Sequence, residues 1–322
     1  MIGVLLVNLG TPEAPDAASV RTYLAEFLSD PRVIEIPQLL WQPILRGIVL
    51  RTRPAKSARA YREVWTDEGS PLLAISMRQA AKLRERLGDE MIVSLAFRYG
   101  KRSIGTAIAK MLDADVDRIL FAPLYPQYCA ATTASSTDAL FAQLATMRFQ
   151  PAVRTLPPYF DDPLYIGALR TNLERQLAAL DFEPQSLLLS FHGMPERTRQ
   201  LGDPYYDQCL ATARLLGEAP GREVDIAFQS RFGRAKWLEP ATDSTLTAYP
   251  GKGVQRLAIA APGFSADCLE TIEELGIRGR DSFLAAGGTH FARLECLNDS
   301  PEGMAMLEQL IARELEGWWP AT

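Results

Sequence analysis

Three short motifs occur twice in the chain, in the same order, and each copy directly follows an apolar segment. The pairs are Gly10-Thr11-Pro12-Glu13 with Gly193-Met194-Pro195-Glu196, Arg98-Tyr99-Gly100-Lys101 with Arg231-Phe232-Gly233-Arg234, and Ala122-Pro123 with Ala261-Pro262. Apolar runs that end at glycine or proline are typical of strands covered on both faces. The repeat therefore predicts an α/β fold of two similar Rossmann-like domains. Each is a parallel sheet flanked by helices, and the active-site cleft lies between the two.

Strand and helix patterns alternate through both halves of the chain. The expected strands are residues 2–8, 91–97, 118–122, 152–156, 186–191, 224–228 and 256–261, with 282–285 and 291–297 as candidate edge strands. Residues 267–275 are expected to form a helix. Pro157-Pro158 interrupts the alternation, so the expected domains are residues 1–156 and 157–301. The C-terminal helix, residues 302–316, is a candidate to pack back on the first domain.

Residues 34–50 carry apolar side chains on nearly all sides of any helix drawn through them. One interpretation is a buried core helix. The other is an apolar lip beside a greasy ligand, or an edge that touches a membrane. Arg46, Arg51 and Arg53 at the flanks fit either interpretation.

Charge and composition exclude several classes of function. The formal net charge is −5, which argues against a nucleic-acid-binding surface because phosphate neutralisation needs a basic face. No apolar stretch is long enough for a transmembrane helix, and the amino terminus lacks the pattern of a signal peptide. The four cysteines are dispersed and form no C-x-x-C pair. These features favour a cytoplasmic protein.

One of the two histidines, His192, directly follows a strand-like apolar run and precedes Gly193. The carboxyl ends of parallel strands open into the ligand crevice, so His192 is a candidate catalytic residue. Asp267, Glu270 and Glu274 are spaced to share one helical face. A histidine opposite a row of carboxylates suits binding of a divalent cation such as Fe(II), or proton transfer at neutral pH.

The first half offers different chemistry at its strand ends. Leu9, Arg98, Tyr99 and Tyr125 follow expected strands. Aromatic rings beside an arginine suit a flat apolar ligand that carries carboxylate arms. No G-x-S-x-G, P-loop or G-x-G-x-x-G pattern is present in the sequence, which disfavours acyl transfer and a nucleotide cofactor.

Several segments together resemble ferrochelatase, the enzyme family that inserts Fe(II) into a porphyrin to make haem. They are Phe97-Arg98-Tyr99, Tyr125-Pro126-Gln127-Tyr128, Ser190-Phe191-His192-Gly193-Met194-Pro195, Gln229-Ser230-Arg231-Phe232-Gly233, Trp237-Leu238-Glu239-Pro240 and Asp267-Cys268-Leu269-Glu270-Thr271. The resemblance covers nearly the full chain. It looks closest to the Gram-negative bacterial type, whose substrate is protoporphyrin IX.

The resemblance implies a metal chelatase, a lyase, with His192 and Glu270 as catalytic and metal-binding residues. Asp267 and Glu274 match further members of a proton or metal path. The positions that match the porphyrin pocket or its neighbourhood are Leu9, Arg98, Tyr99, Tyr125, Trp237 and Phe264. Fe(II) is a substrate in this family, so no permanently bound cofactor is expected.

Two departures from the family pattern carry expectations of their own. Cys268 stands where many relatives have a second histidine, so that histidine is not required here. Ala130 stands where cluster-bearing relatives have a cysteine, so no iron–sulfur cluster is expected. The family also implies a location on the cytosolic side with loose contact to the membrane's inner face, and a monomer, with a weak dimer as the alternative.

Other functions stay open at this point. A coproporphyrin III ferrochelatase or a cobalt chelatase would share the same plan. A non-catalytic haem or porphyrin carrier is an alternative of a different class, and would hold its ligand instead of turning it over. A periplasmic-type solute-binding protein is disfavoured by the missing signal-peptide pattern.

Overall fold

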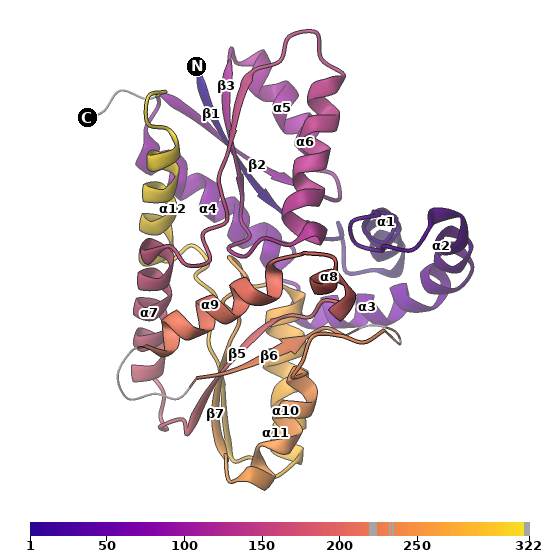
Figure 1. Cartoon of the computed structure of the whole chain (residues 1–322), viewed down its shortest axis with the longest axis vertical. Helices are drawn as coiled ribbons and strands as arrows, with labels where there is room; N and C mark the ends of the chain where they lie inside the picture. Colours follow the sequence, from indigo (N-terminus) through magenta and orange to yellow (C-terminus); the bar gives the residue numbers. More distant parts are fainter. Residues whose placement is uncertain (219–223, 232, 234, 319–322) are drawn as a thin grey trace. The chain divides into compact units, whose positions relative to one another are not determined.

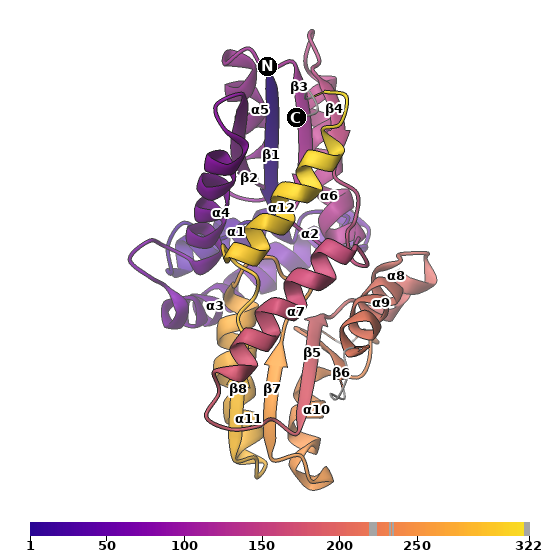
Figure 2. The ribbon, with the colours of Figure 1, turned by 90° about the vertical axis from the view of Figure 1, so that its left-hand side faces the viewer.

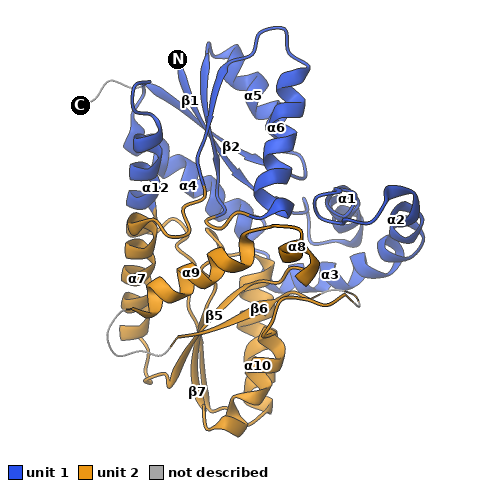
Figure 3. Cartoon of the chain, in the orientation of Figure 1, with its two compact units in different colours: residues 1–125, 129–157, 304–322 blue, residues 126–128, 158–303 orange. Residues whose placement is uncertain are grey.

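The computed structural model describes residues 1–218, 224–231, 233 and 235–318 of the chain. These residues form two compact units (Figure 3). Unit 1 contains residues 1–125, 129–157 and those from 304 onward, and unit 2 contains residues 126–128 and 158–303. The amino- and carboxyl-terminal parts of the chain therefore belong to the same unit.

Unit 1 is built on a four-stranded parallel sheet in the order β2-β1-β3-β4. Its strands are β1 (Ile2–Asn8), β2 (Met91–Phe97), β3 (Arg118–Pro123) and β4 (Ala152–Thr155). The central strand is buried on both faces: Val4, Leu5, Leu6 and Val7 are all 0% exposed. This is why its sequence is a continuous apolar run and not an alternating one.

Helices cover both faces of this sheet (Figures 1 and 2). The helical segments of unit 1 are α1 (Ala17–Phe27), α2 (Gln38–Ile44), η1 (Leu45–Val49), α3 (Leu50–Val64), α4 (Pro71–Leu87), α5 (Ile104–Asp113), η2 (Ala130–Ala134), α6 (Ser135–Ala145) and α12 (Pro301–Glu314), whose first turn lies in unit 2. Helices α5 and α6 pack on the face that presents Leu5 and Val7. Helices α4 and α12 lie on the opposite face, as Figure 2 shows.

Local sequence signals fix where several of these helices begin. The Asp16 side chain accepts hydrogen bonds from the amides of Ala18 and Ser19, and so caps α1. Ser70 and Ser103 cap α4 and α5 in the same way. A short polar side chain at each of these three positions therefore marks a helix start.

Unit 2 repeats the plan of unit 1, with strand order β6-β5-β7-β8 and all neighbours parallel. Its strands are β5 (Ser186–His192), β6 (Val224–Gln229), β7 (Arg256–Ala260) and β8 (His290–Arg293). The identical order explains the motif pairs in the sequence. The predicted fold class, two parallel sheets flanked by helices, is confirmed.

Helices also cover both faces of the second sheet (Figures 1 and 2). They are α7 (Pro163–Ala178), α8 (Glu196–Gln200), α9 (Tyr205–Gly217), α10 (Thr242–Ala248), η3 (Pro250–Lys252), η4 (Glu270–Gly279) and α11 (Arg280–Ala285). Leu246 of α10, Leu275 of η4 and Phe283 of α11 pack on one face, against Leu188 and Ile259. That face therefore carries the segment with the acidic row.

One prediction near the end of unit 2 is wrong, because residues 282–285 belong to the helix α11 and form no edge strand. The helix expected over residues 267–275 is confirmed in part: it is a π-helix that begins at Glu270 and continues to Gly279. A four-residue apolar pattern cannot separate strand from helix, and here α11 simply continues η4. The last edge strand is confirmed in part, since β8 covers His290–Arg293 only.

The apolar segment of residues 34–50 contains α2 and η1 and leads into α3 (Figure 1). Trp41 and Leu45 are buried, which fits the core interpretation in part. The other face is open: Leu39 is 91% exposed and Ile48 is 60% exposed. No helix among the described residues is long and apolar enough to cross a membrane.

Candidate functional site

His192 is the last residue of β5 and pairs in register with Gln229, the last residue of β6. Its imidazole is half-buried, and Nδ1 lies 2.8 Å from the carbonyl oxygen of Gly193. A carbonyl oxygen only accepts, so in the neutral ring Nδ1 carries the hydrogen and Nε2 keeps its lone pair. His192 therefore presents a basic nitrogen at the carboxyl edge of the second sheet.

The turn after His192 requires glycine. The Gly193 amide donates to the Gln229 carbonyl oxygen at 2.7 Å, and a Cβ at position 193 would overlap that oxygen. Unit 1 uses the same device, because a Cβ at Gly10 would overlap the carbonyl oxygen of Tyr99. In both units a glycine follows the end of the first strand, and because glycine has no side chain the main chain there can lie directly against the end of a neighbouring strand.

Two aromatic side chains flank His192 within unit 2. The ring of Phe264, which follows β7, has its centroid 6.5 Å from that of His192. Trp237 forms an isolated bridge with Pro195, and its indole lies beside Gly193. The structure thus brings His192, Trp237 and Phe264 together, as a flat apolar ligand would require.

Glu270 begins η4, and its backbone carbonyl accepts a hydrogen bond of 3.2 Å from the side-chain amide of Gln229. Its own side chain is half-buried. Cys268 lies close by and is buried. Burial, and then the adjacent Glu270 carboxylate, raise the pKa of the Cys268 thiol well above its usual value. The thiol therefore stays protonated beside that carboxylate. Gly193, which follows His192, and Glu270 are therefore both hydrogen-bonded to Gln229, the first through the Gln229 backbone carbonyl and the second through its side-chain amide.

Asp267 and Glu274 are engaged by different partners. Asp267 is buried, and its carboxylate accepts from Arg293 at 2.8 Å, Thr271 at 2.6 Å and Asn298 at 2.8 Å. Glu274 accepts from the amide of Ser230 at 2.8 Å and from its hydroxyl at 2.6 Å. Both roles in a proton or metal path stay predictions.

The geometry of Ser230 follows from its contact with Glu274. Ser230 has a φ of +64°, a left-handed conformation that is uncommon for residues other than glycine. In that conformation its amide and hydroxyl both reach the carboxylate. Of the motif that continues from Ser230, Phe232 and Arg234 lie outside the described residues.

In unit 1, Leu9, Arg98, Tyr99 and Tyr125 all lie at the carboxyl edge of the first sheet, because each follows a strand directly or by one or two residues. Leu9 is half-buried, and its carbonyl oxygen accepts from the Tyr99 amide at 3.0 Å. Tyr125 is half-buried as well, and burial raises the pKa of its hydroxyl. These four residues belong to unit 1, whereas His192 and the acidic row belong to unit 2.

Asp30, which is not among the residues predicted from the sequence, organises this edge of the first sheet. Its buried carboxylate accepts from Arg98 at 2.6 Å, Tyr99 at 2.8 Å and the hydroxyl of Ser135 at 2.6 Å. Burial alone would raise the pKa of the Asp30 carboxyl. The hydrogen bonds from Ser135, the Arg32 amide and Tyr99, together with the charge of Arg98, outweigh burial, so the pKa is lowered. Burial also raises the pKa of Tyr99, which keeps the phenol neutral. The only sequence signal for Asp30 is its position between a helix and Pro31.

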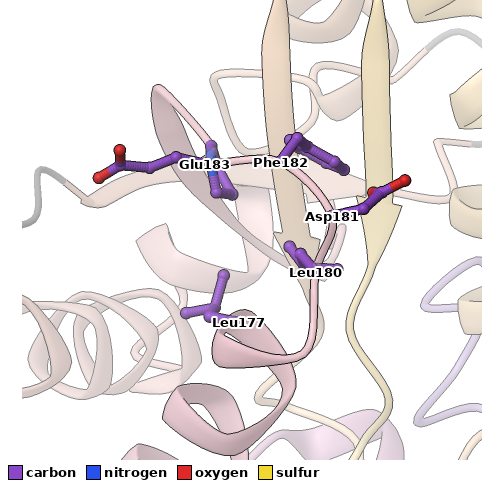
Figure 4. Close-up of a pocket in the computed structure, with 6 residues that line it drawn as sticks. Leu177, Leu180, Asp181, Phe182 and Glu183 are labelled. Carbon is purple, nitrogen blue, oxygen red and sulfur yellow. The ribbon is translucent and has the colours of Figure 1, made fainter.

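A surface pocket of unit 2 lies elsewhere. Leu177, Leu180, Asp181, Phe182, Glu183 and Pro184 line it, between the end of α7 and the start of β5 (Figure 4). His192 is at the other end of β5, a seven-residue strand, and at about 3.3 Å per residue that separates them by roughly 20 Å. The pocket is therefore not part of the candidate site.

Across residues 1–218, 224–231, 233 and 235–318, no three His, Cys, Asp or Glu side chains are grouped so that they could hold a metal ion. The assignment of His192 and Glu270 as metal ligands stays a prediction. His192 offers a basic nitrogen at the carboxyl edge of the second sheet, which suits proton transfer.

Comparison with known proteins decides the family. A family model described as Ferrochelatase matches residues 1–315. The chain belongs to the ferrochelatase family. It is 51% identical over 324 residues to a ferrochelatase of Rhizobium meliloti, covering 98% of this chain and 96% of the relative. It is 50% identical over 320 residues to ferrochelatase 2 of Shewanella oneidensis, covering 96% of each.

The ferrochelatase-family fold is also seen in solved structures of other chelatases. The sirohydrochlorin chelatase SirB from Bacillus subtilis subspecies spizizenii, in complex with cobalt, matches with a TM-score of 0.59 and 11% identity, covering 98% of this chain and 96% of that one. At that identity the likeness concerns the fold alone. The resemblance found in the sequence motifs is confirmed by the family match and by the curated relatives.

Proposed function

We propose that the chain inserts Fe(II) into protoporphyrin IX to form protohaem, the terminal step of haem biosynthesis. As a member of the ferrochelatase family it is a metal chelatase, a lyase. The reaction removes two pyrrole protons from the porphyrin and places one iron ion between its four nitrogens, so charge and atoms balance with two protons released. The enzyme must therefore accept protons beside a flat apolar ring.

The observation that carries this proposal is the protonation geometry of His192. Its Nδ1 is committed to the Gly193 carbonyl oxygen, so Nε2 is the nitrogen that accepts a proton. Phe264 and Trp237 lie beside it and supply apolar surface for a macrocycle. In this proposal His192 takes protons from the pyrrole nitrogens, and Glu270 accepts them from His192 or delivers the iron.

The remaining predicted residues take supporting roles in the same proposal. Asp267 and Glu274 continue the acidic row, although Arg293 and Ser230 already engage their carboxylates. Leu9, Arg98, Tyr99, Tyr125, Trp237 and Phe264 are proposed to line the porphyrin. Binding that bends the macrocycle would turn the nitrogen lone pairs out of plane, at a strain of roughly 1–5 kcal/mol offset by burial of the apolar ring.

We propose that Fe(II) is a substrate and that no iron–sulfur cluster is held. Cluster ligands are thiolates. Cys268 and Cys296 are buried, and burial is the largest cause that raises the pKa of each thiol well above its usual value. The remaining cysteines, Cys129 and Cys209, are buried in different units. We also propose a monomer in the cytoplasm.

Peripheral contact with a membrane is a further part of the proposal. The open face of α2 and η1 presents Leu39, Leu40, Ile44 and Ile48, all exposed. Arg46 is exposed in the same segment. Apolar side chains that enter the acyl boundary, with a cation at the level of anionic headgroups, are typical of interfacial helices. The proposed partner is the anionic inner leaflet.

The test measures haem formation by absorbance. Purified protein is mixed anaerobically with Fe(II) and either protoporphyrin IX or coproporphyrin III. We expect turnover with protoporphyrin IX, and a loss of about 100- to 10,000-fold in kcat for His192→Ala and Glu270→Gln, the usual size of a general acid–base contribution. Porphyrin binding should survive in both variants.

The matched control is His290→Ala, because His290 is the other histidine and lies exposed at the start of β8. Its activity should equal that of the parent. Full turnover by His192→Ala would refute the proposal. Preference for coproporphyrin III would correct the substrate, and a stable haem complex that never turns over would indicate a carrier.

A further inference from the structure

Gln229 is the last residue of β6 and stands between the two groups that the proposed reaction uses. Its backbone carbonyl accepts the Gly193 amide at 2.7 Å, and so holds the turn that follows His192. Its side-chain amide donates to the carbonyl of Glu270 at 3.2 Å, and so holds the start of η4. One residue therefore joins the histidine to the acidic row.

The side-chain amide of Gln229 has a single orientation that satisfies its neighbours. A backbone carbonyl only accepts, so Nε2 must face Glu270. Oε1 then faces Ser190, whose hydroxyl donates to it at 2.7 Å. The Ser190 hydroxyl in turn lies 2.8 Å from the hydroxyl of Thr242, which can donate to it. A directed chain of hydrogen bonds runs from α10 through β5 and β6 to η4.

Burial makes this chain rigid. Gln229 is 2% exposed, Ser190 is 0% exposed and Thr242 is 3% exposed, so water cannot readily replace any of these partners. A buried polar group that loses its partner keeps the full desolvation penalty, which holds the network in this arrangement. The main chain of Glu270 is therefore tied through Gln229 to that of Gly193, and the buried contact with Ser190 holds the Gln229 side chain in place.

We infer that Gln229 is a positioning residue, which sets the separation between His192 and Glu270 for proton transfer. This inference rests on the proposed function. Gln229 touches neither reacting atom directly, and acts through the backbone of Gly193 and Glu270. Displacement of a catalytic group by even 1 Å can cost about 100-fold in rate, so loss of this bridge should lower kcat while porphyrin binding stays intact.

The test compares Gln229→Met with a matched control, Asn172→Leu. Methionine keeps the length of the side chain and removes both hydrogen bonds. Asn172 is also buried in unit 2 and also donates its side-chain amide to a backbone carbonyl, that of Glu295, at 3.0 Å, but it lies on α7. Both variants should lose stability to a similar extent. Only Gln229→Met should lose kcat, by about 10- to 100-fold, with KM for the porphyrin within about twofold of the parent.

A second variant keeps the test decisive if Gln229→Met does not fold. Ser190→Ala leaves Gln229 in place and removes the hydroxyl that orients its amide. Its kcat should fall about fivefold, the rate equivalent of one neutral hydrogen bond. The inference is overturned if kcat of the folded variant stays within twofold of the parent, or if Asn172→Leu loses as much kcat.

Failure of the inference can be told from failure of the proposed function. His192→Ala and Glu270→Gln are assayed beside the Gln229 variant. If those two lose activity while Gln229→Met keeps its kcat, then only the positioning role is wrong. If His192→Ala and Glu270→Gln also keep full activity, the proposed function is wrong, and Gln229 has no catalytic pair to position.

Discussion

Exchanging Asp30 for asparagine removes one charge and leaves the shape of the side chain nearly unchanged, so it isolates the buried ion pair with Arg98. The Asp30 side chain is 4% exposed and that of Arg98 is 21% exposed, at an N–O distance of 2.6 Å. Removing one partner of a buried pair costs about 3–5 kcal/mol, because the other charge is left uncompensated. We expect unit 1 of Asp30→Asn to lose stability by that amount.

Asp138→Asn is the matched control. Asp138 pairs with Arg32 at 2.8 Å, but the two side chains are 54% and 46% exposed. Solvent screens such a pair, so its loss should cost less than about 1 kcal/mol. The double variant Asp30→Asn with Arg98→Met should recover part of the stability, because it removes both buried charges.

Native-state hydrogen exchange of the β1 and β2 amides measures the stability of unit 1 separately from that of unit 2. The pKa of Asp30 is lowered in the folded chain. Its stabilising effect is therefore full above the unfolded-state pKa of about 3.9 and is lost as the pH falls through the folded-state value. The difference between parent and Asp30→Asn should shrink below about pH 4. A loss no larger than that of Asp138→Asn at neutral pH would refute this reasoning.

Two further predictions concern the turn after His192 and the open apolar face. Gly193→Ala should destabilise unit 2 by about 1–3 kcal/mol and abolish most haem formation, because the new Cβ must displace a backbone carbonyl. The control, Gly167→Ala, should change neither stability nor haem formation, because the space around Gly167 is open. Equal thermal stability of the two variants would contradict the steric argument. The double variant Leu39→Glu, Ile48→Glu should reduce co-sedimentation with anionic lipid vesicles at least tenfold, because a charged glutamate side chain cannot stay at the acyl boundary where the leucine or isoleucine side chain would insert. Phe149→Glu, also an exposed apolar position in unit 1, is the control, and equal sedimentation of both variants would exclude the proposed membrane face.

Much of the fold could be predicted because its signals are local. The strand ends at Asn8 and Phe97 follow from apolar runs that stop at glycine-containing turns, and the helix start at Ser103 follows from its capping side chain. The motif repeat indicates that the two sheets share one strand order, but it does not say which order. The structure shows that the order is the same in both sheets. The π-helix at 270–279 was out of reach, because the spacing of its apolar residues resembles that of an ordinary helix.

The site was predictable where the chemistry itself marks the residue. His192 stands at a strand end before a glycine, and its position there is confirmed. The supporting contacts were not predictable, because their partners are distant in sequence: Asp30 and Arg98 are 68 residues apart, and Gln229 and Glu270 are 41 apart. Nothing local in the sequence indicates that Asp267 is paired with Arg293. Those pairings depend on the folded sheet.

The return of α12 to unit 1 has a consequence for how the protein is made. Leu307, Leu310 and Ile311 are 0–2% exposed, and they join a unit whose sheet is finished by residue 157. On the ribosome, roughly 150 residues of unit 2 emerge in between, which at roughly 5–20 residues per second takes on the order of 10–30 s. Throughout that interval α4 alone covers the face of the first sheet that α12 will share, so the earliest part of the chain to be translated is the last to be completed. A nascent chain halted before Pro301 would offer the uncovered part of that face to chaperones.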